Sequence, residues 1–130
     1  MDRPSARRTL AVMLALEGVA HLIKRRYYDS LVPDVLEPVR REIDLATGSL
    51  HLAGSLAMFV PRMRTSGRWL NLPVQVAILV AAVDNVRHPG HIRRDRALLP
   101  ELETLVAGAR IPPRVAAIAL IWWATRPALR

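Results

Sequence analysis

Hydrophobic residues are concentrated in four segments, which polar and proline-containing stretches separate from one another. The segments are residues 9–23, 45–61, 69–86 and 111–125. The stretches VQVAILVAAV and VAAIALIWWA within the last two would be apolar on every side of a helix. That pattern is typical of a helix that is buried all round or spans a membrane. The chain is therefore predicted to contain four long helices.

The three connections between the segments differ in character. The first is polar and holds Pro33 and Pro38, whereas the second, PRMRTSGR, is short enough for a turn between antiparallel helices. The third is polar, with an amphipathic pattern over residues 98–107. We expect one all-α domain over residues 1–130: an up-down-up-down four-helix bundle with a polar loop after helix 1 and a loop containing a short helix before helix 4.

The four segments fit either a soluble helical bundle or a transmembrane bundle. They are short for spans, which need about 17–25 residues, and Arg114 makes the fourth the weakest. Flanking Lys and Arg side chains can extend a span by snorkelling to the interface. Aromatic residues also lie at the segment ends, as in an interfacial belt: Tyr27, Tyr28, Trp69, Trp122 and Trp123. The membrane interpretation is favoured, with spans at about 8–25, 43–61, 68–86 and 111–127.

Composition and charge support this interpretation. Of the 130 residues, 52% are hydrophobic and 23% charged, and the net charge of +8 would suit an anionic partner. The basic residues border the apolar runs: Arg7, Arg8, Lys24, Arg25, Arg26, Arg62, Arg64, Arg68, Arg93, Arg94 and Arg96. This arrangement favours lipid headgroups over nucleic acid. The chain has no cysteine, which excludes thiol, disulfide and iron–sulfur chemistry of its own.

Orientation in the membrane depends on the turn at residues 62–68. If both termini lie on one side, eight of the nineteen Lys and Arg residues lie there and eleven lie opposite. The short turn carries three Arg and no acidic residue, which favours cytoplasmic termini. The first segment has no small-residue cleavage site, so we expect it to remain as the first span of a multi-pass protein of the cell membrane.

Several short motifs occur in an order shared with a known family. They are GVAHL at 18–22, Tyr28, Val32-Pro33, Thr47-Gly48, Pro61, Asn85, Pro112, Trp122 and Trp123. From about Arg8 to Pro127 the chain resembles the DoxX-like family of small bacterial four-helix membrane proteins. The resemblance implies a membrane protein; some members are associated with membrane redox systems and quinone reduction. The chain departs from the family at His51, where an acidic residue is common.

Ionisable residues inside the apolar runs are the candidates for function. Glu17 and His21 are four residues apart and are expected to pair on one face of the first helix. The antiparallel arrangement brings them towards a polar cluster consisting of Glu17, His21, Asp44, His51, Asp84 and Asn85. The cluster either fixes helix register through hydrogen bonds or forms a pocket for a quinone or another polar lipid headgroup. Gly48 and Gly54 are expected to permit close helix packing.

No catalytic arrangement or metal motif stands out. Glu17, His21, His51 and Asp84 are suitable ligand types, but their spacing matches no metal motif, so no metal site is expected. No cofactor is evident, although a quinone fits the polar cluster, and whether the protein is an enzyme stays open. The expected partners are membrane lipids and a membrane redox protein. The two hypotheses are a quinone- or lipid-headgroup-interacting redox accessory and a non-catalytic membrane module that supports a complex.

Overall fold

The computed structural model describes residues 2–88 and 100–126, which are almost entirely helical. Its elements are α1 (Arg3–Ile23), α2 (Arg25–Asp29), the 3-10 helix η1 (Asp34–Val39), α3 (Arg40–Phe59), the 3-10 helix η2 (Pro61–Met63), α4 (Arg64–Arg87), α5 (Pro100–Ala109) and α6 (Ile111–Thr125). No β-strand occurs in the two described ranges, so the all-α prediction is confirmed. The short helix expected near residues 98–107 is α5; the loop before it, residues 89–99, lies outside the described residues.

Local sequence sets the ends of the long helices. The side chain of Asp2 caps α1 by accepting a hydrogen bond from the backbone N–H of Ser5, at 3.1 Å, so this helix begins five residues before the expected span. The end of α3 is set by a proline. Val60 is extended because Pro61 follows it, so α3 ends at Phe59.

A pair of prolines separates α5 from α6, which together form one rod-like segment of the bundle. Pro112 and Pro113 have no N–H with which to bond the carbonyls of Gly108 and Ala109. The chain therefore turns at Arg110, whose N–H bonds the carbonyl of Ala107 at 3.2 Å, before α6 begins.

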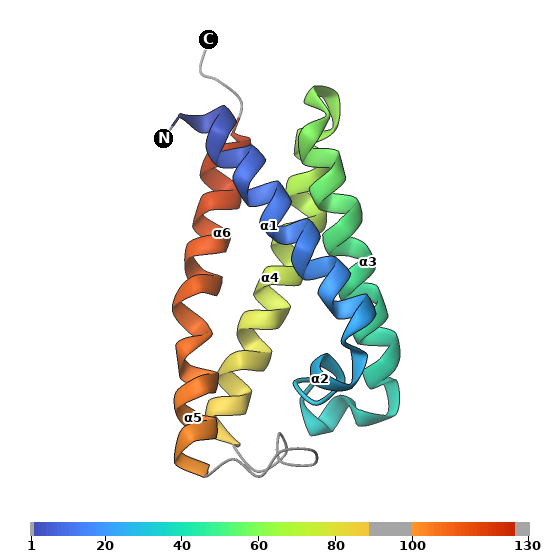
Figure 1. The fold of residues 1–130 in the computed structure, drawn as a ribbon, viewed down its shortest axis with the longest axis vertical. Coiled ribbons are helices and arrows are strands. Elements are labelled where there is room, and N and C mark those ends of the chain that lie inside the picture. Colours follow the sequence, from blue (N-terminus) through green and yellow to red (C-terminus); the bar gives the residue numbers. More distant parts are fainter. Residues whose placement is uncertain (1, 89–99, 127–130) are drawn as a thin grey trace.

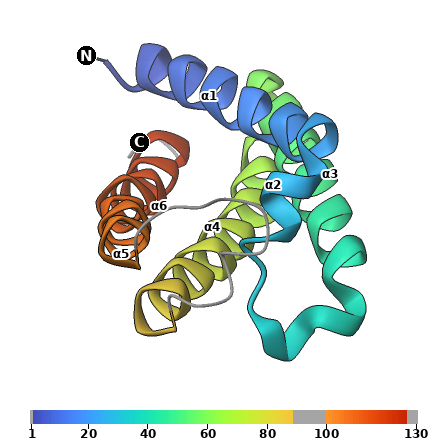
Figure 2. The same cartoon turned by 60° about the horizontal axis from the view of Figure 1, so that its bottom comes forward.

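The long helices form a ring around one interior. α1 packs on α3, α3 on α4, α4 on α6, and α6 on α1. Figure 1 shows the alternating directions of these helices: α1 begins and α6 ends at one end of the molecule, while α2 lies at the other end. Seen from a tilted view, α2 and the segment after it curve past the lower parts of α1 and α3 (Figure 2).

Glycines allow the closest helix contacts. A Cβ atom on Gly18 of α1 would lie 2.8 Å from the carbonyl oxygen of Gly48 in α3, and one on Gly67 of α4 would lie 2.7 Å from the carbonyl oxygen of Gly54 in α3. Backbone therefore meets backbone at both crossings, as expected for Gly48 and Gly54. The polar side chains that flank these glycines are consequently held inside the bundle.

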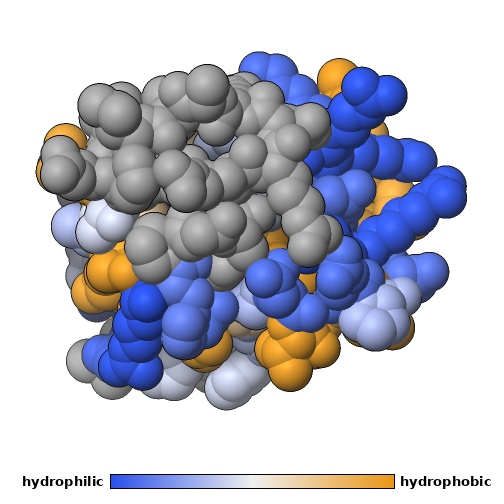
Figure 3. All heavy atoms as spheres, turned by 90° about the horizontal axis from the view of Figure 1, so that it is seen from below, coloured by the Kyte–Doolittle hydropathy of each residue, from blue (hydrophilic) through white to orange (hydrophobic). Residues whose placement is uncertain are grey.

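Polar side chains occupy much of the interior, and large apolar side chains cover much of the outside. His51, Asn71 and Gln75 are each 0% exposed, whereas Leu16 and Ile23 are 64% and 74% exposed. One cluster of buried apolar residues in the described chain lies near the termini and consists of Leu10, Ala11, Leu14, Met58 and Ile121. From the end that carries α2 and η1, the coloured surface is largely hydrophilic, with hydrophobic patches between the hydrophilic side chains (Figure 3).

Two segments are long and apolar enough to cross a membrane: Pro61–Arg87 and Thr104–Thr125, each with a mean hydropathy of 1.4. The second includes the turn at Arg110. In the described residues, α1 and α3 do not meet the same criteria; α1 starts with several arginines, and α3 starts with two arginines and two acidic residues.

Candidate functional site

A continuous hydrogen-bonded network of five polar side chains crosses the middle of the bundle, and we call it the central network. Glu17 of α1 forms an ion pair with Arg114 of α6. Gln75 of α4 lies between them: its amide nitrogen donates to Glu17 at 3.4 Å, and its oxygen accepts from Arg114 at 3.3 Å. The same amide nitrogen lies 3.5 Å from Nε2 of His51 in α3, and His51 Nδ1 lies 3.0 Å from Oδ1 of Asn71 in α4. The network thus joins all four long helices.

The partners in the central network fix the tautomer of its histidine. Asn71 donates its amide nitrogen to the carbonyl of Gly67 at 3.0 Å, so its oxygen faces His51 and requires a proton on Nδ1. Gln75 is oriented in the same way, because Arg114 can only donate to its oxygen. The Gln75 amide then donates to Nε2, and His51 is neutral with its proton on Nδ1. Every bond has one donor and one acceptor, as a stable buried network requires.

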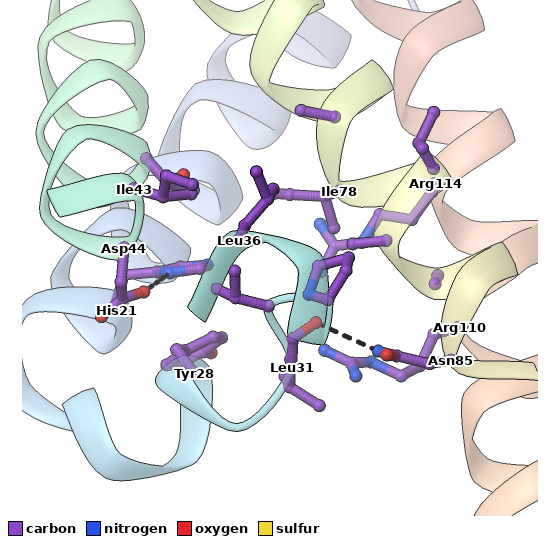
Figure 4. Close-up of a pocket in the computed structure, with 17 residues that line it drawn as sticks. His21, Tyr28, Leu31, Leu36, Ile43, Asp44, Ile78, Asn85, Arg110 and Arg114 are labelled. Atoms are coloured by element: carbon purple, nitrogen blue, oxygen red, sulfur yellow. Dashed lines mark hydrogen bonds and ion pairs between the residues drawn. The ribbon is translucent and has the colours of Figure 1, made fainter. Parts of the chain in front are cut away.

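A pocket of about 290 Å³ lies beside this network, towards the end of the bundle that carries α2. Figure 4 shows His21, Asp44 and Tyr28 on one side of it and Asn85, Arg110 and Arg114 on the other. The surfaces between them are apolar and come from α3, α4 and the segment after α2, with Leu36, Ile43 and Ile78 among the side chains. The pocket therefore has an apolar body with a few polar groups, which is typical of a small-molecule site.

His21 and Asp44 form the polar pair of the first wall. Nδ1 of His21 lies 2.5 Å from Oδ1 of Asp44, and both residues are buried. The ring of Tyr28 stacks on the His21 ring with 3.7 Å between centroids. Oδ2 of Asp44 is buried and has no hydrogen-bond partner within the described part of the chain. This oxygen is an acceptor that a donor group of a bound molecule would satisfy.

Asn85 holds the segment that closes the pocket. Its amide nitrogen donates to the carbonyl of Leu31 at 3.2 Å, which ties the end of α4 to the turn before Pro33. Both residues are buried at this contact.

Tyr28 also lines the pocket. Burial raises the pKa of its phenol, because the charged phenolate is disfavoured in an environment with little water.

The six candidate residues from the sequence fall into three places. His21, Asp44 and Asn85 line the pocket. Glu17 and His51 belong to the central network, with 3.9 Å between His51 Nε2 and Glu17 Oε2. Asp84 joins neither group, because its Oδ1 lies 3.0 Å from Nδ1 of His88, which follows the last residue of α4.

The expected pairing of Glu17 with His21 is wrong. The two residues are neighbours on α1, but each has its partner on another helix: Arg114 of α6 for the glutamate and Asp44 of α3 for the histidine. Within the described residues, no group of three His, Asp or Glu side chains lies close enough to hold a metal ion.

Several polar residues of the interior were not among the candidates. Arg114 is the principal one, because an arginine within an apolar segment only weakens the prediction of a span. A second is Arg68 of α4, which is buried at the other end of the bundle. Its Nε donates to Oγ1 of Thr125 at 2.9 Å, and its guanidinium lies 5.0 Å from the ring centroid of Trp122. Lone arginines inside or beside apolar runs were the available signal, since a buried cation requires a partner.

Comparison with known proteins places the chain in a family without assigning an activity. No curated protein and no solved structure matches the chain. One family profile matches residues 10–128, which include every residue of the central network and of the pocket. The chain therefore belongs to the family described as a domain of unknown function, DUF8561.

Proposed function

We propose that this chain is a multi-pass integral membrane protein of the DoxX-like type, in which α1, α3, α4 and the α5–α6 rod cross the bilayer. The combination of apolar side chains on the outer surface with polar side chains in the interior carries the proposal. Soluble proteins mostly bury apolar residues and expose polar ones, whereas the described part of this bundle buries nine polar or charged residues, among them His51, Asn71 and Gln75. In a bilayer, polar groups gain from facing the bundle interior, and apolar groups gain from facing lipid.

The exposure of the two most apolar segments supports the same proposal. A core helix of a soluble protein is also long and apolar, but it is mostly buried. Here only 28% of the 18-residue apolar stretch within Pro61–Arg87 is buried in the protein, and only 11% of the corresponding stretch within Thr104–Thr125. Such extensive apolar exposure is unfavourable in water and favourable in lipid. α1 contributes further exposed apolar side chains, among them Val12, Met13 and Leu16.

We propose that both termini are cytoplasmic. α1 begins and α6 ends at the same end of the bundle as the α3–α4 turn (Figure 1). The turn and the first residues of α4 carry Arg62, Arg64 and Arg68 without an acidic residue, and short basic connections favour the cytoplasmic side. Reporter fusions at the termini and within residues 62–68 should then report one side, and fusions within residues 30–38 the other.

The pocket is proposed to bind the polar head of a membrane-soluble molecule, either a quinone or a lipid headgroup. His21 and Asp44 offer hydrogen-bonding groups at one wall, where the unpartnered Oδ2 of Asp44 can accept from a hydroxyl group of the reduced quinol or of a lipid headgroup. Leu36 and Ile78 offer apolar surface for the remainder of the ligand. A quinone-binding role would make the protein an accessory of a membrane redox system, in which a partner protein supplies the electrons because the chain has no cysteine and no evident cofactor motif.

The membrane proposal is tested by extraction. The protein should remain in the membrane pellet through high-salt and carbonate washes, because spanning helices and not surface charge hold it there. Release of most of the protein by salt would contradict the proposal in favour of a basic soluble bundle.

The ligand proposal is tested by filling the pocket. Ala81 lines the pocket, so Ala81→Phe should occupy the space of a ligand. Ala119→Phe on the exposed side of α6 is the matched control. Mass spectrometry of lipids and quinones that co-purify in mild detergent should show a molecule bound to the parent and the control and lost from Ala81→Phe.

The second candidate function is a non-catalytic membrane module that supports a complex. The closed central network favours it, because every donor and acceptor named in that network already has a partner and needs no ligand. This alternative predicts that Ala81→Phe and the parent carry the same co-purifying molecules, and that a partner protein is lost only when an outer face of the bundle is changed.

A further inference from the structure

The charged side chains around the pocket differ in whether they have a partner of opposite charge or a hydrogen-bond partner. Arg114 is already paired with Glu17 and bonded to Gln75. The carboxyl group of Asp44 shares a short hydrogen bond with His21, on the side of the pocket opposite Arg110 (Figure 4). Glu17 and Asp44 are thus each bonded to a partner other than Arg110.

Arg110 supplies a positive charge that no carboxylate balances in the described part of the chain. It lies at the turn between α5 and α6, and its guanidinium is 6.0 Å from the ring centroid of Tyr27, a contact that leaves its charge intact. Figure 4 shows the Arg110 side chain directed along the pocket wall towards Leu31, beside Asn85. The pocket thus combines apolar walls with one uncompensated cation.

From this combination we infer that the pocket takes a single-chain amphiphile whose head carries a negative charge, as a carboxylate or a phosphate. The guanidinium of Arg110 binds the head, for which its planar N–H groups are suited. The hydrocarbon chain lies against the apolar side chains of α3 and α4, such as Ile43 and Ile78. The inference rests on the proposed ligand-binding function and specifies the charge of the head, which a neutral quinone does not have.

The volume of the pocket agrees with a single-chain ligand. At about 290 Å³ it lies just below the range of about 300–1,000 Å³ that is usual for small-molecule sites. A head with the first part of one chain fits such a volume, and the remainder of the chain would extend into the surrounding lipid. A two-chain phospholipid would have to leave its second chain outside.

Photolabelling with matched probes tests the inference on the full chain in a neutral detergent. The probes are hexadecanoic acid, hexadecyl phosphate and hexadecanol with the same diazirine in the chain, together with decylubiquinone as a neutral competitor. Peptide mapping locates the label. The acid and the phosphate ester should label the α4 peptide containing Ile78 and Ala81 roughly tenfold more efficiently than the alcohol, as expected for a charge-assisted hydrogen bond.

Two arginine variants assign the effect. Arg110→Gln should remove the preference for the acid and the phosphate ester. Arg126→Gln should keep this preference, because Arg126 lies at the other end of the bundle. It is a matched control, since its guanidinium also lies over an aromatic ring, 5.3 Å from the centroid of Trp122. Melting temperatures in detergent show that both variants fold.

Each other outcome has a definite meaning. If the alcohol or decylubiquinone occupies the pocket as well as the acid does, the head charge is not recognised and this inference fails, whereas the proposed ligand site stands. If no probe labels the pocket, the ligand site itself fails. If inorganic phosphate displaces both charged probes, the site binds a free anion and not an amphiphile. A preference that persists in Arg110→Gln removes the role of Arg110.

Discussion

Glu17 in the first helix and Arg114 in the last form an ion pair inside the bundle. Their side chains are only 17% and 16% exposed, and Gln75 bonds both of them. α1 and α6 are the two helices that close the ring, so the pair links the beginning of the chain to its end. In an apolar environment each charge depends on the other for its stabilisation.

Removing one partner of this pair should be more harmful than removing both. Glu17→Gln leaves Arg114 as an uncompensated charge and is expected to lower the free energy of unfolding by about 3–5 kcal/mol, the usual cost for a buried pair. The double variant with Arg114→Gln should recover much of this loss, because two amides remain that can bond each other and Gln75. Denaturation in detergent measures all three proteins. Additive losses in the double variant would show that the two charges do not interact.

The crossing of α1 and α3 should tolerate no side chain at Gly18. In Gly18→Ala the Cβ atom would lie 2.8 Å from the carbonyl oxygen of Gly48 and 2.9 Å from the backbone nitrogen of Leu52. Both are backbone atoms, so the helices must separate, and we expect a loss of about 1–3 kcal/mol as for other overpacked sites.

Gly108→Ala is the control for this prediction. A Cβ atom on Gly108 meets nothing within 4 Å, so alanine should leave stability unchanged or raise it by up to about 1 kcal/mol through helix propensity. Equal melting temperatures for Gly18→Ala and the parent would show that α1 and α3 are farther apart in solution than in this structure.

The helices could be predicted from the sequence, whereas the pairing of their polar residues could not. Apolar runs and prolines mark where each helix lies, and α3 ends before Pro61 as such a pattern predicts. The pairing depends on how far each helix is rotated about its axis. Glu17 and His21 therefore looked like partners from their spacing, although the facing residues on other helices are Arg114 and Asp44.

Arg68→Lys should destabilise the end of the bundle near the termini. The guanidinium of Arg68 bonds both the hydroxyl and the carbonyl of Thr125 while it lies over the ring of Trp122. An ammonium group cannot reproduce this planar double contact, and we expect a loss of about 1.5–3 kcal/mol, the contribution of a hydrogen bond to a charged group. Arg62→Lys, at an exposed position in η2, should change stability by less than about 0.5 kcal/mol.

Tyr28 should make the protein sensitive to alkaline pH. Burial raises the pKa of its phenol above the ordinary value of 10.0, so the folded state keeps the proton at a pH where the unfolded chain has lost it. Its contribution to stability is therefore complete below about pH 10, the ordinary pKa of the phenol, and is lost as the pH rises from there through the raised pKa of the folded state. Tyr28→Phe retains the ring that stacks on His21 but cannot ionise. The difference in unfolding free energy between parent and variant, measured in detergent, should thus shift in favour of the variant between pH 8 and pH 11. A difference that stays constant over this interval would mean that the phenol of Tyr28 is in contact with water.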